Sequence, residues 1–237
     1  MKYFIQGISL AIYLISQNIH AGVVITGTRI IYPSNQSSVT VQLSNPGEHP
    51  SLIQSWLDDG NPSSIPEAGK IPFILTPPVT QVLPKKGQMI RLIAHKAEQL
   101  PQDRETMYWF NILDIPAVEE SDKAQNKLNI SIRSRIKFFY RPVKLSTTQE
   151  KAFKSANVNY DLSKKKIVIN NNSAYYLNFQ YLRLNADQKK SEYPESILIQ
   201  PFETQELSPK IEFTPKKIEY GLINDYGAVQ NFEKNIE

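Results

Sequence analysis

The side chains that most often carry catalysis are sparse in this sequence. After residue 21 the chain has two histidines, His49 and His95, too few for a multi-histidine metal cage, and no cysteine for thiol catalysis or thiolate ligation. The carboxylates Glu119 and Glu120 are adjacent, but they stand in a polar loop close to Lys123, where solvation explains them. There is no Gly-x-Ser-x-Gly elbow, phosphate-binding glycine loop or His-Glu-x-x-His motif. The sequence therefore predicts a protein that is not an enzyme and needs no metal or cofactor.

Charge recognition beside an apolar surface is a second kind of chemistry, and residues 128–142 have the pattern for it. Apolar residues recur on one face and end beside a lysine: Leu128, Ile130, Ile132, Ile136 and Lys137. The alternation predicts a β-strand whose other face is polar: Asn129, Ser131, Arg133 and Arg135. Two interpretations remain open. The pattern favours an ordinary core strand; the alternative is an edge strand whose apolar residues are kept for a partner that completes its own sheet.

The N-terminus has the features of a secretory signal peptide. It begins Met1-Lys2, continues with an apolar run over 3–15, and reaches the small-residue site Ile19-His20-Ala21 before Gly22. We expect cleavage near Ala21. The apolar run is too short to span a bilayer comfortably and no comparable stretch follows, so we expect no membrane insertion.

The bulk composition limits the fold and the partners. After such a leader, the 237-residue chain is long enough for two β-sandwiches of roughly 100 residues each. Without cysteine, stability must come from packing rather than from disulfides. The net charge of +4 is mild and scattered, and its densest run, 164–166, is explained by a solvated turn, so no nucleic-acid partner is expected.

Short segments rich in Val, Ile, Tyr and Phe recur along the chain, and no helical spacing is sustained after the leader. This pattern predicts an all-β protein. The expected strands of the first half are 23–32, 39–45, 52–57, 73–75, 79–83, 88–94, 106–114 and 128–140. The pattern restarts after Pro142 with 158–162, 166–170, 177–184, 197–199, 205–207 and 217–223. We therefore expect a signal peptide over 1–21 and domains over 22–144 and 145–237.

Two local features of the first half carry specific expectations. Trp56, in the third expected strand, is interpreted as the plug of the sandwich core. The sequence Thr76-Pro77-Pro78-Val79 interrupts a β region, and proline lacks the N–H that a central strand needs, so it must be an edge or a turn. A cis peptide bond at Pro77 or Pro78 is a further hypothesis.

Residues 100–117 run from a polar turn into an aromatic strand with the sequence Leu-Pro-Gln-Asp-Arg-Glu-Thr-Met-Tyr-Trp-Phe-Asn-Ile-Leu-Asp-Ile-Pro-Ala. Along its whole length this segment resembles the signature of the periplasmic pilus chaperones of the chaperone-usher pathway. Other motifs agree with that family and occur in the same order: Thr28-Arg29, Thr76-Pro77-Pro78, the run Ile136 to Pro142, and Ile223-Asn224-Asp225-Tyr226-Gly227. The resemblance implies two immunoglobulin-like sandwiches in an L-shaped arrangement with a cleft between them.

The resemblance also implies roles for individual residues. In the family, an arginine of the first strand and a lysine of the last strand of domain one bind the C-terminal carboxylate of a pilus subunit; the matching positions are Arg29 and Lys137. Leu128, Ile130 and Ile132 would form the donor strand that fills the groove of an incomplete subunit sandwich. Without the resemblance, Arg29 would be interpreted as a surface residue and Lys137 as a strand end.

A third set of residues matches an ion-pair network that ties the two domains together in the family: Glu105, Arg141 and Asp225. We expect a structural role for this network. The sequence departs from the family in other places. The loop over 116–127 is short, as in the short-loop members, a cysteine pair found in some second domains is absent, and Ala228 replaces a common glycine, which leaves the local turn in doubt.

The function implied by the resemblance is that of a periplasmic chaperone. Such a protein binds, folds and caps pilus subunits by donor-strand complementation and delivers them to the outer-membrane usher, without ATP or a cofactor. The exposed edge leaves self-association of the free chaperone open. The alternative is a secreted two-domain β-sandwich that binds carbohydrate or acts as an adhesive module, with Tyr175, Tyr176 and Tyr181 as its platform. A hydrolase on an immunoglobulin-like scaffold is the least favoured.

Overall fold

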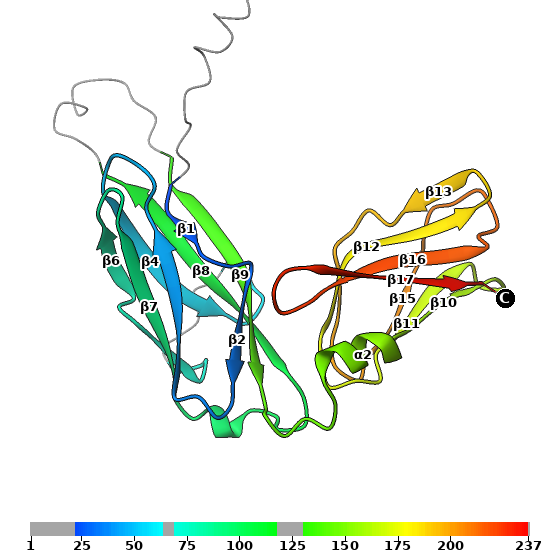
Figure 1. The fold of residues 1–237 in the computed structure, drawn as a ribbon, viewed down its shortest axis with the longest axis horizontal. Coiled ribbons are helices and arrows are strands. Elements are labelled where there is room, and N and C mark those ends of the chain that lie inside the picture. The colour runs from blue at the N-terminus through cyan, green and yellow to red at the C-terminus, as the bar shows by residue number, and fades with distance from the viewer. Residues whose placement is uncertain (1–21, 64–68, 118–129, 237) are drawn as a thin grey trace, which may run out of the picture.

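The computed structural model describes residues 22–63, 69–117 and 130–236. Strands predominate there, and two β-sandwiches stand at an angle to each other, joined by the segment that follows β9 (Ile132–Arg141) (Figure 1). The prediction of an all-β fold with two sandwich domains is confirmed. No helix in this part of the chain is long and apolar enough to cross a membrane. The predicted signal peptide and Leu128 lie outside the described residues.

The first sandwich packs a four-stranded sheet against a five-stranded one. The smaller sheet has the spatial order β1 (Val24–Ile25), β3 (Ser38–Ser44), β7 (Gly87–Ala94) and β5 (Phe73–Thr76). The larger has the order β2 (Arg29–Pro33), β9, β8 (Thr106–Pro116), β4 (Ser51–Asp58) and β6 (Val79–Val82). A short 3₁₀ helix, η1 (Ala97–Gln99), precedes β8. Inward-facing side chains of both sheets form one core around the rings of Tyr32, Phe73 and Phe138.

The predicted strand 23–32 divides in two because the chain changes sheets at Gly27. β1 pairs antiparallel with β3, whereas β2 pairs parallel with β9 in the other sheet. Gly27 has a φ of +104°, a conformation that L side chains rarely adopt. On one side, β9 pairs with β8 over residues 132–140. On the other side it pairs with β2 only over residues 137–141, so on that side residues 132–136 have no neighbouring strand among the described residues.

The proline pair lies between two edge strands, as predicted. β5 is at the edge of the smaller sheet and β6 is at the edge of the larger one, so neither proline interrupts a central strand. The Thr76–Pro77 peptide bond is cis.

Trp56 does not fill the core, and that prediction was wrong. In β4 the buried apolar side chains are Ile53 and Leu57, so the period-two alternation turns Trp56 to the outer face of the larger sheet. There the guanidinium carbon of Arg133 lies 4.9 Å from the centroid of the Trp56 ring.

The second sandwich has a three-stranded and a five-stranded sheet. The smaller sheet has the order β10 (Asn157–Asp161), β11 (Lys166–Asn170) and β15 (Thr204–Leu207). The larger has the order β13 (Lys189–Glu192), β12 (Leu177–Ala186), β16 (Lys217–Ile223) and β17 (Val229–Asn235), with β14 (Ile197–Ile199) also paired to β12. Its core includes Phe153, Phe179, Leu182 and Tyr220.

Three elements of this domain were absent from the predictions. The helix α2 (Gln149–Ser155) has only seven residues, too few to establish a helical period in the sequence. It begins after Thr148, whose hydroxyl accepts a hydrogen bond from the N–H of Lys151 (3.4 Å), and it buries Ala152 and Phe153. β13 and β17 are mostly polar, so they lack the apolar alternation by which strands are recognised.

Candidate binding site

Arg29 and Lys137 lie side by side where β2 meets β9. They are register partners in the parallel strand pair. Arg29 Nη1 donates a hydrogen bond to the carbonyl oxygen of Ile223 in the second domain (3.0 Å), so this pair stands where the two domains meet. The Lys137 ammonium lies 5.0 Å from the centroid of the Trp109 ring. Neither cation forms an ion pair with an acidic side chain of the described residues.

Burial lowers the pKa of both cations. For Arg29, burial is the main cause, and the negative charges of Asp225 and Glu105 oppose it. For Lys137, burial is again the main cause, and the positive charges of Arg29 and Arg135 add to it. Arg29 Nε is also buried without a hydrogen-bond partner among the described residues. Burial disfavours the charged form of both side chains, and at Lys137 the positive charges of Arg29 and Arg135 add to this cost. A bound anion would offset the cost through charge-assisted hydrogen bonds, so the pair is suited to a carboxylate.

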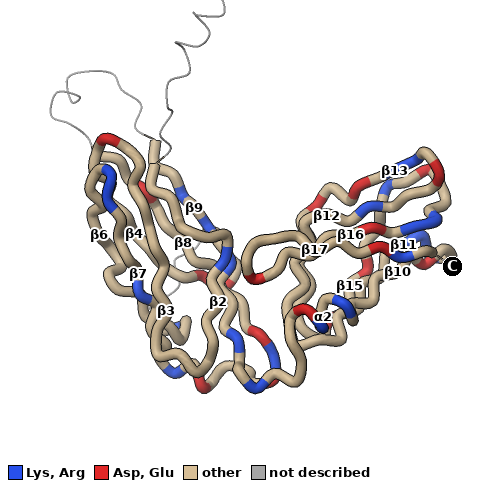
Figure 2. Tube along the Cα trace, viewed as in Figure 1, with Lys and Arg blue, Asp and Glu red and all other residues tan. Residues whose placement is uncertain are grey.

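An apolar edge leads up to these cations. Ile130 lies two residues before the start of β9 and is 62% exposed. Ile132, the first residue of β9, is 48% exposed, whereas Ile136 is half-buried against the core. A cavity of about 280 Å³ opens between β1 and β9, and its lining includes Ile25, Ile132 and Ser134. The free backbone edge, the exposed isoleucines and the cavity therefore lie together along the stretch of chain that leads to Lys137, in the middle of β9. Figure 2 shows basic residues along the same strand.

Side chains on the outer face hold the open half of β9 in place. The carboxylate of Asp58, on β4, is fully buried and accepts hydrogen bonds from Arg135 Nε (3.1 Å) and Asn111 Nδ2 (2.8 Å). Arg133 donates to Asn111 Oδ1 through Nε (3.0 Å) and Nη2 (2.7 Å). The Arg135 guanidinium carbon also lies 4.1 Å from the centroid of the Trp109 ring. The two arginines that the sequence placed on a polar face are thus part of a network across β9, β8 and β4.

The structure also brings Glu105, Arg141 and Asp225 together. Arg141 donates to Glu105 Oε1 from Nε (2.7 Å) and to both oxygens of Asp225 from Nη1 and Nη2 (2.6 and 2.7 Å). Glu105 Oε2 accepts a hydrogen bond from the N–H of Tyr176 in the second domain (2.8 Å). Burial alone would lower the pKa of Arg141, but the hydrogen bond to Asp225 and the charge of Glu105 raise it overall. The three side chains therefore connect the two sandwiches through charged groups.

The three tyrosines proposed as a carbohydrate platform do not form one. Tyr175 is buried, with its hydroxyl donating to the carbonyl of Thr147 (2.8 Å), and Tyr176 packs on Phe139 with ring centroids 5.6 Å apart. Tyr181 is separately covered by Arg183, whose guanidinium carbon lies 4.0 Å from the ring centroid. The rings of Tyr175 and Tyr176 are packed at the domain junction, so these three tyrosines do not support the carbohydrate-binding alternative.

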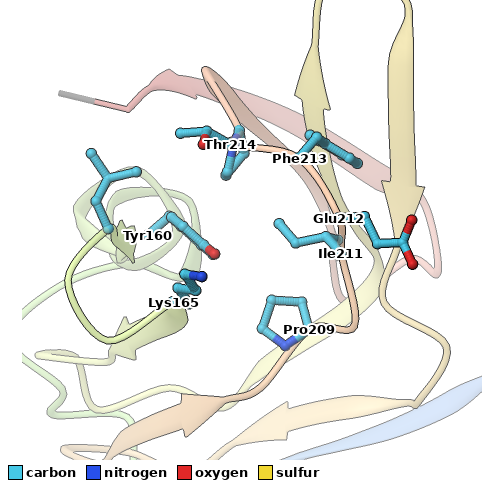
Figure 3. Close-up of a pocket in the computed structure, with 9 residues that line it drawn as sticks. Tyr160, Lys165, Pro209, Ile211, Glu212, Phe213 and Thr214 are labelled. Atoms are coloured by element: carbon cyan, nitrogen blue, oxygen red, sulfur yellow. The ribbon is translucent and has the colours of Figure 1, made fainter.

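A separate cavity of about 520 Å³ lies in the second domain and contains none of the predicted site residues. It is lined by Tyr160, Lys165, Ile211, Glu212 and Phe213, among others. Figure 3 shows the Glu212 carboxylate directed away from Tyr160 and Lys165, so the pocket presents no acid–base pair. The described residues also contain no group of three or more His, Asp or Glu side chains that could hold a metal ion.

Comparisons with known proteins agree with this geometry. Residues 22–146 match the family described as pili and flagellar-assembly chaperone, PapD N-terminal domain, and residues 153–234 match the C-terminal domain of the pili assembly chaperone PapD. The chaperone protein HifB of Haemophilus influenzae is 39% identical over 214 residues, covering 89% of this chain and 86% of HifB.

Solved structures show the same arrangement. The YadV chaperone superposes with a TM-score of 0.77 at 33% identity, covering 91% of this chain and 100% of YadV. The SafB chaperone of Salmonella enterica, solved in complex with the SafA pilin, also has a TM-score of 0.77, at 23% identity, covering 93% of this chain and 99% of the other. The fold and the two family matches define a two-domain pilus chaperone, and the chain belongs to the pilus-assembly chaperone family.

Proposed function

We propose that this protein is a periplasmic chaperone that binds pilus subunits through β9, completes their fold and delivers them to an outer-membrane usher. The observation that carries the proposal is the open edge of β9, where exposed Ile130 and Ile132 lead directly to the unneutralised pair Arg29 and Lys137. An exposed apolar edge is normally an aggregation hazard, which a partner strand removes.

The position of the two cations fixes the direction of a bound strand. The open edge of β9 ends where β2 begins, at the register pair Arg29 and Lys137. A subunit whose terminal carboxylate is held there, and whose chain runs back past Ile132 and Ile130, lies parallel to β9 and in line with β2. Because a one-residue slip would turn every side chain to the other face, a fixed carboxylate also sets the register.

Both the apolar edge and the cation pair contribute to affinity. Burial of apolar side chains such as Ile130 and Ile132 contributes about 1.5 to 3 kcal/mol each before ordering costs. Leu128 is proposed as the third member of this donor set. Charge-assisted hydrogen bonds from Arg29 and Lys137 to the carboxylate contribute about 1.5 to 3 kcal/mol each. Glu105, Arg141 and Asp225 hold the two domains in position around the site and do not contact the subunit.

The cellular context follows from the same proposal. The leader is removed near Ala21, and the mature chain comprises domains over 22–144 and 145–237. Strand exchange needs no bond breaking in the chaperone, so the protein acts without catalysis, ATP or a cofactor. The free protein, with the same edge exposed, is able to associate with itself until a subunit covers it.

The proposal is tested by purifying the tagged chaperone from the periplasm of its own host and identifying co-purifying proteins by mass spectrometry. The wild type should bring down pilus subunits in equimolar amount. The double variant Arg29→Ala with Lys137→Ala should bring down none while its circular dichroism stays that of the wild type. The matched control is Lys86→Ala with Arg91→Ala, which removes one exposed lysine and one exposed arginine away from β9. Normal recovery of subunits by the first double variant would refute the anchor.

A further inference from the structure

The turn between β16 and β17 points toward β2 and β9 of the first domain (Figure 1). Gly227 in this turn approaches Thr28 so closely that an added Cβ would come within 2.6 Å of Thr28 Oγ1. At the start of the turn, the carbonyl oxygen of Ile223 accepts the hydrogen bond from Arg29 (3.0 Å). Since Thr28 immediately precedes Arg29, the tip of the turn stands where the open edge of β9 ends and β2 begins.

The turn is held in one conformation by side-chain hydrogen bonds. Asn224 Oδ1 accepts from the backbone N–H groups of Tyr226 and Ala228, each at 3.0 Å. The Asp225 carboxylate is fixed by both terminal nitrogens of Arg141 (2.6 and 2.7 Å). Ala228, which replaces a common glycine, is compatible with this turn, because its backbone N–H donates one of the hydrogen bonds to Asn224.

The side chain at the tip of this turn has no role in the fold. Tyr226 is 95% exposed, and its ring makes no aromatic or cation–π contact with the described residues. A fixed backbone that presents a free tyrosine is typical of binding surfaces, because the ring buries a large area with little loss of side-chain entropy. Tyrosine is correspondingly enriched among the residues that dominate interface energies.

We infer that Tyr226 belongs to the subunit-binding surface and packs on an apolar or aromatic side chain among the last residues of the bound chain. The inference rests on the proposed function, which places the terminal carboxylate at Arg29 and Lys137. A strand advances about 3.3 Å per residue, so the residues just before that carboxylate lie beside the turn. The two cations recognise only a charge that every free C-terminus carries. Tyr226 adds discrimination between C-terminal sequences.

The test uses a synthetic octapeptide, acetyl-Thr-Val-Thr-Val-Thr-Val-Phe-Thr with a free carboxylate, and its counterpart with Ala in place of Phe. Dissociation constants are measured by isothermal titration calorimetry with the full mature chain. The wild type should bind the Phe peptide about two- to tenfold more tightly, the range expected for an aromatic pair. Tyr226→Ala should abolish this preference and Tyr226→Phe should keep it. Leu162→Ala, which truncates another exposed apolar side chain of the second domain, should change neither peptide's affinity.

The outcomes separate this inference from the proposed function. If Tyr226→Ala retains the preference for the Phe peptide, or if the wild type has none, the inference is wrong while the anchor stands. If Arg29→Ala binds both peptides as tightly as the wild type, the anchor itself is wrong. If the wild type binds neither peptide, both are overturned. Because the Tyr226 side chain is 95% exposed, the wild type, Tyr226→Ala and Tyr226→Phe should have the same thermal unfolding temperature.

Discussion

Arg29 and Lys137 are opposite each other in the parallel pair of β2 and β9, and no acidic side chain among the described residues forms an ion pair with either. Both side chains are partly desolvated, and at Lys137 the positive charge of Arg29 adds to the cost of burial, so a charged Lys137 is unfavourable in the free protein. Such an arrangement lowers the free energy of unfolding, and this cost is expected where binding needs a cation without an acidic partner.

Replacing Lys137 with Met should therefore stabilise the free chaperone while it prevents subunit capture. We expect a gain of about 0.2 to 1 kcal/mol, the range for a like-charged cross-strand pair. The pKa of Lys137 is lowered from its ordinary 10.5, so the unfolded chain binds more protons as the pH approaches that value. The stability of the wild type should then rise relative to Lys137→Met across this window. Urea unfolding at pH 7 and at pH 10 measures both effects, and an unchanged difference would contradict the charge argument.

The exposed stripe gives a second prediction. Ile130→Asp should weaken subunit binding by at least about 1.5 to 3 kcal/mol, or roughly ten- to a hundredfold in affinity, because one buried apolar side chain is lost and a carboxylate enters the apolar contact. Its stability should stay within about 0.5 kcal/mol of the wild type because Ile130 is 62% exposed. Met89→Asp is a close match in exposure, at 61%, on the other sheet. Equal affinity of the two variants for the co-purified subunit would mean that Ile130 does not contact the subunit.

The strands could be predicted from the sequence because their side chains alternate, but alternation favoured a core strand over 128–140, and only the family resemblance implied an open edge. Three predicted strands of the second domain, 166–170, 197–199 and 217–223, have the bounds that the structure shows. By contrast, the free half of β9 exists because the chain leaves one sheet for the other at Gly27, so that β2 reaches β9 only from Lys137 onward. Such a change of sheet depends on long-range pairing, and local alternation has no information on it.

Trp56 and Asp58 show two further limits. Both faces of β4 carry apolar residues, so large size alone favoured Trp56 for the core, whereas Ile53 and Leu57 occupy it. Asp58 lies just beyond the predicted strand 52–57, and its hydrogen-bond partner Arg135 is 77 residues away in the sequence, so local spacing gives no sign of their contact. The family resemblance singled out the residues that meet at Arg141, but not this second network.

The domain junction gives a third prediction. Arg141→Met leaves the carboxylate of Glu105, which is only 3% exposed, without its cation and should cost about 3 to 5 kcal/mol. Adding Glu105→Gln should recover part of this loss, because the buried charge is then removed. Arg183→Met, which breaks a surface pair with Glu192, should cost at most about 1 kcal/mol. Differential scanning calorimetry compares the variants; a loss no larger for Arg141→Met than for Arg183→Met would mean that the junction adds no stability.

The buried carboxylate of Asp58 should make the first domain sensitive to acid. Burial alone would raise its pKa, but hydrogen bonds from Arg135, Asn111 and Gly60 together lower it below its ordinary value. As the pH falls, the unfolded chain is therefore protonated first, and the stabilisation that is complete above about pH 5 is lost toward the lowered pKa. Asp58→Asn should cost about 1.5 to 3 kcal/mol at pH 7, and this difference should shrink between pH 5 and pH 2.5. Urea midpoints over that range measure it, and curves that stay parallel would show that Asp58 has the same pKa in both states.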